Sequence, residues 1–170
     1  MLILARTNLG IAQLLLDRPK EAEANLRQVV DLPFETLPRD HPLRFAAQSR
    51  LALVYAQRDD YAAADAIYTD LSQSQIAAFG LSHPNSLDTL SILTRARIAN
   101  SAAGTDRLTP ARMLLQGLAE RIGAADNGLG GEAQSTRDRA NLADYYSRAV
   151  DAMWLARSQD LATIRGEAFA

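Results

Sequence analysis

The sequence predicts an all-α chain, and three observations lead to this fold class. Alanine, a strong helix former, occurs 31 times among the 170 residues. All six prolines lie at or before residue 110, so the rest of the chain is free of this helix breaker. Apolar residues recur every three or four positions, as a helix requires, and no segment alternates like a β-strand. Within 46–56 these residues are Ala47, Leu51, Val54 and Tyr55.

A repeat of 42 residues organises the first hundred residues. His41-Pro42 and His83-Pro84 are 42 residues apart, and the same offset relates apolar and small residues. The related pairs are Leu9 and Leu51, Gly10 and Ala52, Ala22 and Ala64, Leu26 and Tyr68, Val29 and Leu71, and Leu51 and Leu93. Each unit therefore has two helices, joined by a polar turn (17–20 or 58–60) and followed by a loop ending in His-Pro. Such a unit is an antiparallel helix hairpin.

Small residues and prolines set the expected geometry of each hairpin. Gly10 and Ala22 let the two helices approach closely, while Leu9 and Leu26 fill the space beside the contact. The proline of each His-Pro pair suits the first turn of the next helix, where its missing amide hydrogen is not needed.

The residues before each His-Pro pair are the expected helix caps. Asp40 and Ser82 have side-chain oxygens that can accept hydrogen bonds from exposed amides. His41 and His83 are therefore interpreted as structural loop residues rather than as bases or metal ligands.

These residues resemble the tetratricopeptide repeat in its kinesin light chain type. That family has a Leu-Gly or Leu-Ala pair on the first helix, and on the second a contact alanine with an aromatic residue or leucine four positions later. The 42-residue spacing with Gly-x-x-His-Pro is similar to the kinesin light chain form, and Tyr55 and Tyr61 match its aromatic positions. The resemblance covers residues 1–100. It implies a right-handed superhelical solenoid of antiparallel helix hairpins. The aromatic residues are interpreted as packing residues rather than recognition residues; they are Tyr55, Tyr61, Tyr68 and Trp154.

The whole chain, 1–170, is predicted to be one domain of four repeats. Their expected limits are 1–41, 42–83, 84–131 and 132–170, the last repeat being degenerate and truncated. In the third repeat an insertion of five residues moves the contact alanine to Ala111. The second helix of that repeat is expected from Pro110, after Thr109, to Gly123, with Leu115 and Leu118 on its packing face. In the fourth repeat, helices are expected over 135–157, with Leu142, Tyr146 and Trp154 packing, and over 160–170.

Composition and charge exclude several classes of function. With Lys+Arg 18 against Asp+Glu 20, the net charge of −2 disfavours nucleic acid as a partner. The chain has no Cys and no metal-ligand spacing of His or carboxylates, so neither a metal nor another cofactor is expected. No stretch approaches the roughly 18 apolar residues of a membrane-spanning helix. No serine has the context of a nucleophile elbow, and the Gly-rich segment 128–131 lacks the phosphate-loop Lys. We expect a cytoplasmic protein without enzymatic activity.

The family resemblance implies a role in protein–protein recognition. In tetratricopeptide repeats the first helices line a concave groove, which receives an extended peptide or a helix of another protein. The corresponding positions here are the candidate partner-binding residues Asn8, Arg50, Arg95, Asn141, Asp144 and Arg148. Asn8 and Asn141 match the family's groove Asn, which can hold a peptide amide, while Arg50 and Ile92 depart from it. Arg50 and Arg95 favour an acidic partner. The alternative is that these are ordinary solvated residues of exposed helix faces.

The two ends of the chain suggest further roles. Neither 2–4 nor 168–170 supplies a polar cap, so the chain looks like a piece of a longer protein whose apolar ends favour self-association. Residues 140–146 followed by 165–170 are similar to the segment that precedes a CHAT peptidase domain in bacterial repeat proteins. With the Ala- and Arg-rich composition, this likeness implies a bacterial protein. It also offers an alternative function, a regulatory repeat segment of a multidomain CHAT-type peptidase.

Overall fold

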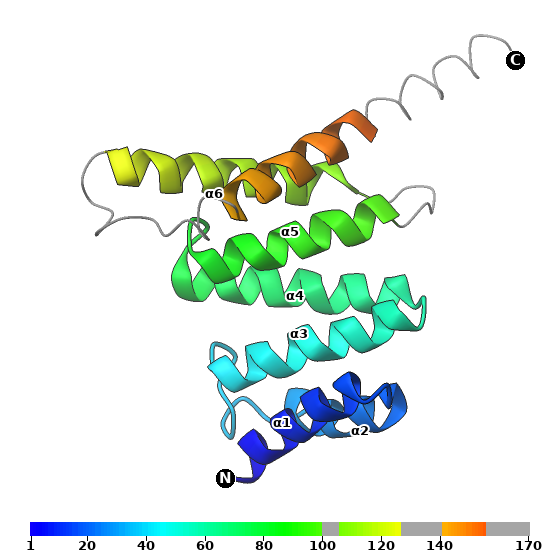
Figure 1. Ribbon diagram of the computed structural model, residues 1–170. Helices are drawn as coiled ribbons and strands as arrows, with labels where there is room; N and C mark the ends of the chain where they lie inside the picture. The colour runs from blue at the N-terminus through cyan, green and yellow to red at the C-terminus, as the bar shows by residue number, and fades with distance from the viewer. Residues whose placement is uncertain (100–105, 127–140, 156–170) are drawn as a thin grey trace, which may run out of the picture. The chain divides into compact units, whose positions relative to one another are not determined.

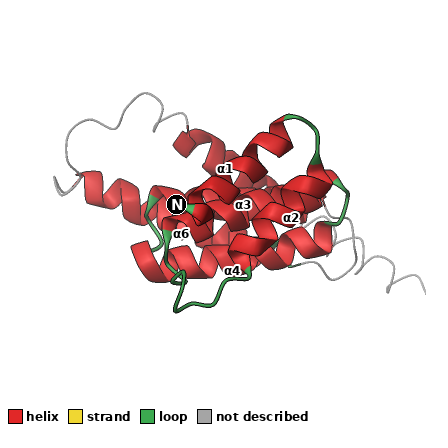
Figure 2. Cartoon of the chain, turned by 90° about the horizontal axis from the view of Figure 1, so that it is seen from below, coloured by secondary structure: helices red, strands yellow, loops and turns green. Residues whose placement is uncertain are grey.

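The computed structural model describes residues 1–99, 106–126 and 141–155, and every regular element in these ranges is a helix (Figure 1). The helices are α1 (Leu2–Leu15), α2 (Pro19–Val30), α3 (Pro42–Gln57), α4 (Tyr61–Phe79), α5 (Pro84–Ala99) and α6 (Leu108–Asp126). Residues 141–155 are also helical, and Figure 2 shows only helices and loops among the described residues. The all-α prediction is confirmed. The chain divides into two compact units, Met1–Ala78 and Phe79–Ala170, which are described separately.

The helices fall within the repeats that the sequence predicts. The pairs α1–α2, α3–α4 and α5–α6 lie within the predicted repeats 1–41, 42–83 and 84–131. In the first unit, α2 contacts both α1 and α3, and α1 also contacts α3. The grouping of four repeats into one domain stays a prediction. The predicted helix over 160–170 and the Gly-rich segment 128–131 lie outside the described residues.

The turn within each hairpin of the first unit is built around an aspartate. Asp17 and Asp59, which are 42 residues apart, have positive φ angles of 55° and 60°. In each turn the amide of the following residue donates to the carbonyl five positions before it, at 2.9 Å and 3.0 Å. This is the left-handed helix ending that satisfies the last carbonyls of a helix and reverses the chain. Asp tolerates this conformation better than most residues because its short polar side chain bonds locally.

A close contact between α1 and α2 holds the first hairpin together. A Cβ atom added to Gly10 would lie 2.7 Å from Cγ of Leu26, so the backbone of α1 lies directly on this leucine. Ala22 of α2 is fully buried, as are Ala52 and Ala64 at the corresponding positions of the second hairpin. The predicted small residues at the contact are therefore confirmed.

Two residues predicted to pack in the hairpin cores of the first unit are not fully buried. Leu9 is 49% exposed, whereas its counterpart Leu51 is 3% exposed. The reason is that Leu9 lies on a face of α1 that no described residue covers. Tyr68 is buried as predicted, but Tyr61 is only partly buried, and its hydroxyl donates to Asp59 at 2.8 Å. The hydroxyl thus holds this ring at the solvent-facing turn.

One buried arginine organises the loop between α2 and α3, residues 31–41. Arg44 belongs to α3, yet it reaches back into the loop and is only 3% exposed. Its guanidinium donates to the backbone carbonyls of Val30, Leu32, Leu37 and Pro38. The ring of Phe34 lies over the group, with its centroid 4.8 Å from the guanidinium carbon. Burial lowers the pKa of Arg44, but the carbonyls replace the water that the charge has lost.

Both His-Pro pairs cap the helix that follows. Nδ1 of His41 accepts a hydrogen bond from the amide two residues on, at 3.1 Å, and Nδ1 of His83 accepts the equivalent bond at 3.2 Å. The prediction that Asp40 and Ser82 are the caps is therefore wrong. The histidine lies one residue nearer to the free amides of the helix, and its ring nitrogen reaches them. Both histidines have the structural role expected of them.

The loop before α5, residues 80–83, is much shorter than the loop before α3. Gly80 turns the chain directly after α4 with a φ of 87°, a conformation that favours glycine. Ser86, which lies 42 residues after Arg44, donates to the carbonyl of Gly80 at 2.9 Å. The ring of His83 stacks on Phe79, with 4.6 Å between the ring centroids. In both loops, the residue at the same repeat position, Arg44 or Ser86, hydrogen-bonds the loop to the helix that follows it.

α6 begins earlier and ends later than predicted, spanning Leu108–Asp126 instead of 110–123. Oδ1 of Asp106 accepts hydrogen bonds from the amides of Leu108 and Thr109, at 3.1 Å and 3.0 Å. The cap is thus Asp106, and the predicted cap Thr109 lies inside the helix. Burial raises the pKa of Asp106, but hydrogen bonds from Thr109 and the charge of Arg97 outweigh this effect and lower it.

The packing face of α6 is close to the predicted one. Its buried apolar residues are Ala111, Leu114 and Leu118. Leu115, predicted on this face, is only partly buried. A Cβ atom added to Gly117 would lie 2.8 Å from the carbonyl oxygen of Leu81, so the backbone of α6 approaches the 80–83 loop closely.

Candidate partner-binding surface

Asn8 and Arg50 lie on the first helices of the first unit, α1 and α3, which contact each other. Both side chains are exposed, and neither makes a hydrogen bond or an ion pair in the part of the chain that the structure describes. Each precedes a buried contact residue, Gly10 or Ala52, by two positions. Two residues rotate a helix by about 200°, which turns the side chains at 8 and 50 to solvent. Both residues are therefore exposed, on two first helices that contact each other.

In the second unit, only part of the predicted set is free to bind a partner. Arg95 on α5 and Asn141 are exposed, and neither has a polar partner among the described residues. Asp144 and Arg148 form an ion pair one helical turn apart, and Arg148 also donates to Oγ of Ser91 at 2.7 Å. The charges of Asp144 and Arg148 thus compensate each other, and Arg148 attaches the 141–155 helix to α5.

The 141–155 helix packs with a different face from the one predicted. Its buried residues are Tyr145, Ala149 and Ala152. Tyr146 is 60% exposed and Trp154 is 68% exposed, so the prediction that they pack is wrong, and Leu142 is only partly buried. The two alanines allow the close approach, and the largest side chains, on which the prediction relied, lie outside it.

Tyr145 is the polar anchor of this helix. Its hydroxyl donates to the carboxylate of Asp88 on α5. Burial, and then the hydrogen bond to Asp88, raises the pKa of Tyr145 far above its ordinary value. The hydroxyl therefore remains a donor at any physiological pH.

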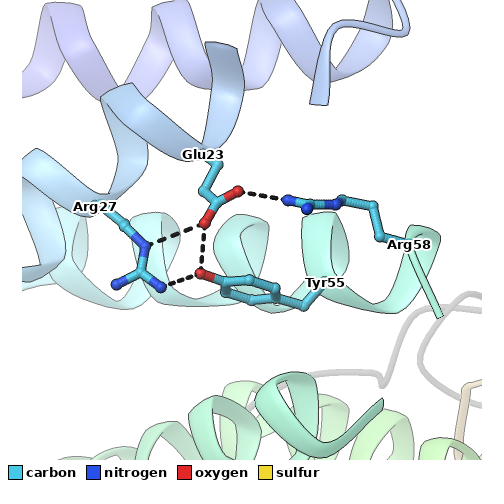
Figure 3. Close-up of polar contacts among 4 residues, drawn as sticks. All are labelled: Glu23, Arg27, Tyr55 and Arg58. Atoms are coloured by element: carbon cyan, nitrogen blue, oxygen red, sulfur yellow. Dashed lines mark hydrogen bonds and ion pairs between the residues drawn. The ribbon is translucent and has the colours of Figure 1, made fainter. Parts of the chain in front are cut away.

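A cluster of four polar side chains joins α2 to α3 (Figure 3). Oε1 of Glu23 accepts hydrogen bonds from the hydroxyl of Tyr55 at 2.7 Å and from Nε of Arg27 at 3.2 Å. Its Oε2 accepts one from Arg58 at 2.6 Å, and Arg27 also donates to the Tyr55 hydroxyl. The hydrogen bond from Tyr55 and, despite partial burial, the two arginines lower the pKa of Glu23. Sequence reasoning treated Tyr55 as an apolar packing residue and missed this polar role.

A pocket of about 390 Å³ lies beside α4. Its lining residues are Arg39, Asp40, Gln73, Ser74, Ala77 and Ala78. Nε of Arg39 donates to Oγ of Ser74 at 3.0 Å, and the same guanidinium pairs with Asp70. None of the six predicted partner-binding residues lines this pocket, and its one cation is already paired.

The exposed polar groups of the first helices include guanidinium groups and amides. Within the described ranges, no group of three or more His, Asp or Glu side chains could hold a metal ion. No helix of these ranges has the length and apolar character needed to cross a membrane. The first helices instead offer uncompensated guanidinium groups at Arg50 and Arg95 and amides at Asn8 and Asn141, all exposed. Such groups form hydrogen bonds with carboxylates and peptide backbones.

No family model and no curated protein sequence matches this chain. Solved structures do match its fold. One is a putative kinesin light chain with nearly identical TPR-like repeats from Podosopora anserina, at 23% identity and a TM-score of 0.59, over 95% of this chain and 76% of that one. A structure of a point variant of that putative kinesin light chain matches at 20% identity and a TM-score of 0.50, over 95% of both chains.

BtubC (BKLC) from P. vanneervenii also matches, at 10% identity and a TM-score of 0.59. The match covers 93% of this chain and 63% of the BtubC chain, so this chain spans less than two thirds of that protein. All three likenesses concern the fold. Together with the helix hairpins described above, they show that the chain has the all-helical fold of TPR-like repeats, similar to those of kinesin light chain.

Proposed function

We propose that this chain is a protein-interaction module that binds an acidic peptide or protein segment on the exposed faces of its first helices. The likeness to TPR-like repeat structures supports a scaffold role. The concave groove of that family is where this proposal places Asn8, Arg50, Arg95 and Asn141. Asp144 and Arg148 would serve mainly to hold the 141–155 helix in place, because they already pair with each other.

The observation that carries the proposal is the contrast between Arg50 and Arg95 and most other arginines. Nine arginines of the described part make hydrogen bonds to protein groups: Arg18, Arg27, Arg39, Arg44, Arg58, Arg97, Arg107, Arg121 and Arg148. Arg50 and Arg95 are exposed and make none with described residues. A free guanidinium offers a planar fork of donors that matches a carboxylate in two parallel hydrogen bonds. An acidic ligand would supply the missing partner.

A binding titration with a defined probe tests this proposal. The probe is a short fluorescent peptide rich in Glu and Asp, compared with the same peptide carrying Gln and Asn, and the readout is fluorescence anisotropy. We expect the acidic peptide alone to bind. Arg50→Glu and Arg95→Glu should each weaken its binding by about tenfold or more, the value of one charge-assisted hydrogen bond.

Arg112→Glu is the matched control. Arg112 is also an exposed arginine without a partner in the described part, but it lies on α6, a second helix. The control should bind within about twofold of the unchanged chain, since salt screens a distant charge. Circular dichroism must show equal helicity for all variants. An equal loss in the three variants would mean that net charge, not the first-helix surface, governs binding, and the proposal would be wrong.

A further inference from the structure

α1 exposes an unusual number of large apolar side chains. The exposed leucines of α1 and its C-terminal cap, with their exposed fractions, are Leu2 (63%), Leu4 (49%), Leu9 (49%), Leu15 (83%) and Leu16 (67%). The only charged residue within α1 is Arg6. A helix that is apolar on all sides is normally buried, and an exposed patch of this kind marks an interaction surface.

Five exposed residues form one stripe along this helix. We call Leu2, Ala5, Leu9, Ala12 and Leu16 the α1 stripe, and all five are exposed. Their spacing alternates between three and four residues, which keeps them in line along a helix and is the spacing by which two helices pack along a common seam. The stripe lies away from Thr7 and Gly10, which are buried against the rest of the first unit.

The repeat shows that the corresponding face of α3 is a packing face. The residues 42 positions after Ala5, Leu9 and Ala12 are Ala47, Leu51 and Val54, and all three lie in the core cluster of the first unit. In α3 this face shares the core cluster with Ala22, Leu26 and Val29 of α2, which contacts α3. In α1 no described residue covers it. The α1 stripe therefore has the composition and spacing of a face that is normally covered by another helix.

A helix of the α2 type would be a poor match for the α1 stripe. α2 presents Glu23 to α3, where Tyr55 and Arg58 satisfy its carboxylate. The residues of α1 at those repeat positions are Gln13 and Leu16. Gln13 is already bonded within the first hairpin, and Leu16 is apolar. A carboxylate placed there would lose water without gaining a partner, which is costly. The α1 stripe requires an apolar partner.

We propose that the α1 stripe packs against the α1 stripe of a second copy of this chain, with the two helices antiparallel. The stripe reads Leu-Ala-Leu-Ala-Leu in both directions around Leu9, so it is its own complement under a two-fold axis. Leu2 then lies opposite Leu16 and Ala5 opposite Ala12, with the alanines allowing the backbones to approach. The antiparallel arrangement also sets the helix dipoles in a favourable orientation. With Arg6 as the one charge of α1, like-charge repulsion is small.

Sedimentation velocity of the whole chain over a range of concentrations tests this pairing. The unchanged chain should pass from a species of 18.5 kDa to one of twice that mass as its concentration rises. Leu9→Glu places two carboxylates opposite each other at the centre of the stripe and should weaken dimerisation by at least about a hundredfold. Leu4→Glu is the matched control, because Leu4 has the same 49% exposure on another face of the same helix. This variant should dimerise like the unchanged chain.

Cross-linking gives a second readout that does not depend on stability. The chain has no Cys, so Leu9→Cys introduces a single thiol. A short bifunctional thiol reagent should join two copies of the Leu9→Cys variant efficiently and two copies of the Leu4→Cys variant poorly. A chain that is monomeric at all concentrations would overturn the proposal. The proposal would also be overturned if the dimer persisted in the Leu9→Glu variant but dissociated in a Trp154→Glu variant. Trp154 lies on the exposed face of the 141–155 helix.

Discussion

The two loops that lead into α3 and α5 begin their helices in the same way but solve different problems. Both end in His-Pro, and in both the histidine caps the helix. The first loop spans 31–41 after a 12-residue α2, whereas the second spans 80–83 after a 19-residue α4. The extra length of α4 equals the length that its loop lacks, so the spacing of 42 residues is preserved. The two repeats therefore have the same total length, but they divide it differently between the second helix and the loop after it.

The side chain that hydrogen-bonds each loop to the following helix also differs between the two loops. Arg44 and Ser86 occupy equivalent repeat positions, and both are buried and donate to carbonyls of the preceding loop. The long loop leaves several carbonyls without helical partners, and only a side chain with five donors can satisfy them. In the short loop, the hydroxyl of Ser86 donates to one carbonyl, that of Gly80. The number of carbonyls that the side chain at this repeat position satisfies thus differs between the long and the short loop.

Removing the Arg44 side chain, which bonds the long loop to α3, should have the largest effect on stability. Arg44→Ala leaves four carbonyls without their donor in a buried place, and we expect it to lower the free energy of unfolding by about 3 kcal/mol or more. Ser86→Ala removes one hydrogen bond and should cost about 1 kcal/mol. Urea unfolding followed by far-UV circular dichroism measures both. Equal losses in the two variants would show that the two ties are energetically alike and would contradict this comparison.

Replacing the capping histidines should have an intermediate effect on stability. It should also separate the contribution of the capping hydrogen bond from that of the stacked ring. His41→Ala and His83→Ala each remove a helix cap, at a cost of about 1 kcal/mol. His41→Asn should recover most of that loss, since Asn is a good cap. His83→Asn should recover less, because it also removes the ring that stacks on Phe79. The measurement is again the urea midpoint. Full recovery in both Asn variants would rule out a contribution from the stacked rings.

The smallest effect concerns the pH dependence of the Glu23 cluster, which joins the helices on either side of the long loop. The pKa of Glu23 is lowered in the folded chain, so its contribution to stability is present above the pKa of the unfolded state. It is lost as the pH falls through the lower folded-state value. Tyr55→Phe removes the largest cause of that shift.

The test compares the unchanged chain with Tyr55→Phe at neutral and at acid pH, using urea midpoints. Both should be less stable in acid because other carboxylates also titrate, but the unchanged chain should lose more. The Tyr55→Phe variant keeps the ring and its packing, so the difference between the two isolates the hydroxyl. Parallel losses would mean that Glu23 gains nothing from this tyrosine.

The repeat and the helix contacts could be predicted from the sequence because they depend on spacing. Small residues mark the close contacts between helices, at positions given by the 42-residue offset and, in the third repeat, by the five-residue insertion. The structure confirms these positions, which are Gly10, Ala22, Ala64 and Ala111. A small residue at a contact has no good substitute, so its position is a strong signal. The same is true of the prolines that begin α3 and α5.

The caps and the faces of unpaired helices could not be predicted in this way. Several polar residues precede each helix, and only the path of the loop decides whether His41 or its neighbour reaches the free amides. Asp106 was missed as the cap of α6 for the same reason. On the 141–155 helix, Tyr145 and the adjacent Tyr146 are equivalent in composition, and the position of Asp88 on α5 decides which of them is buried. Choices of this kind depend on contacts distant in sequence, which one sequence does not reveal.

The left-handed turns at Asp17 and Asp59 have a consequence for the order in which the chain folds. Each turn reverses the chain within a few residues, so the two helices of a hairpin meet at a low cost in loop-closure entropy. Contacts that are local in sequence form quickly. We therefore expect α1 and α2 to associate early, as one cooperative unit, and the long loop to become ordered only later, when α3 brings Arg44 to its carbonyls.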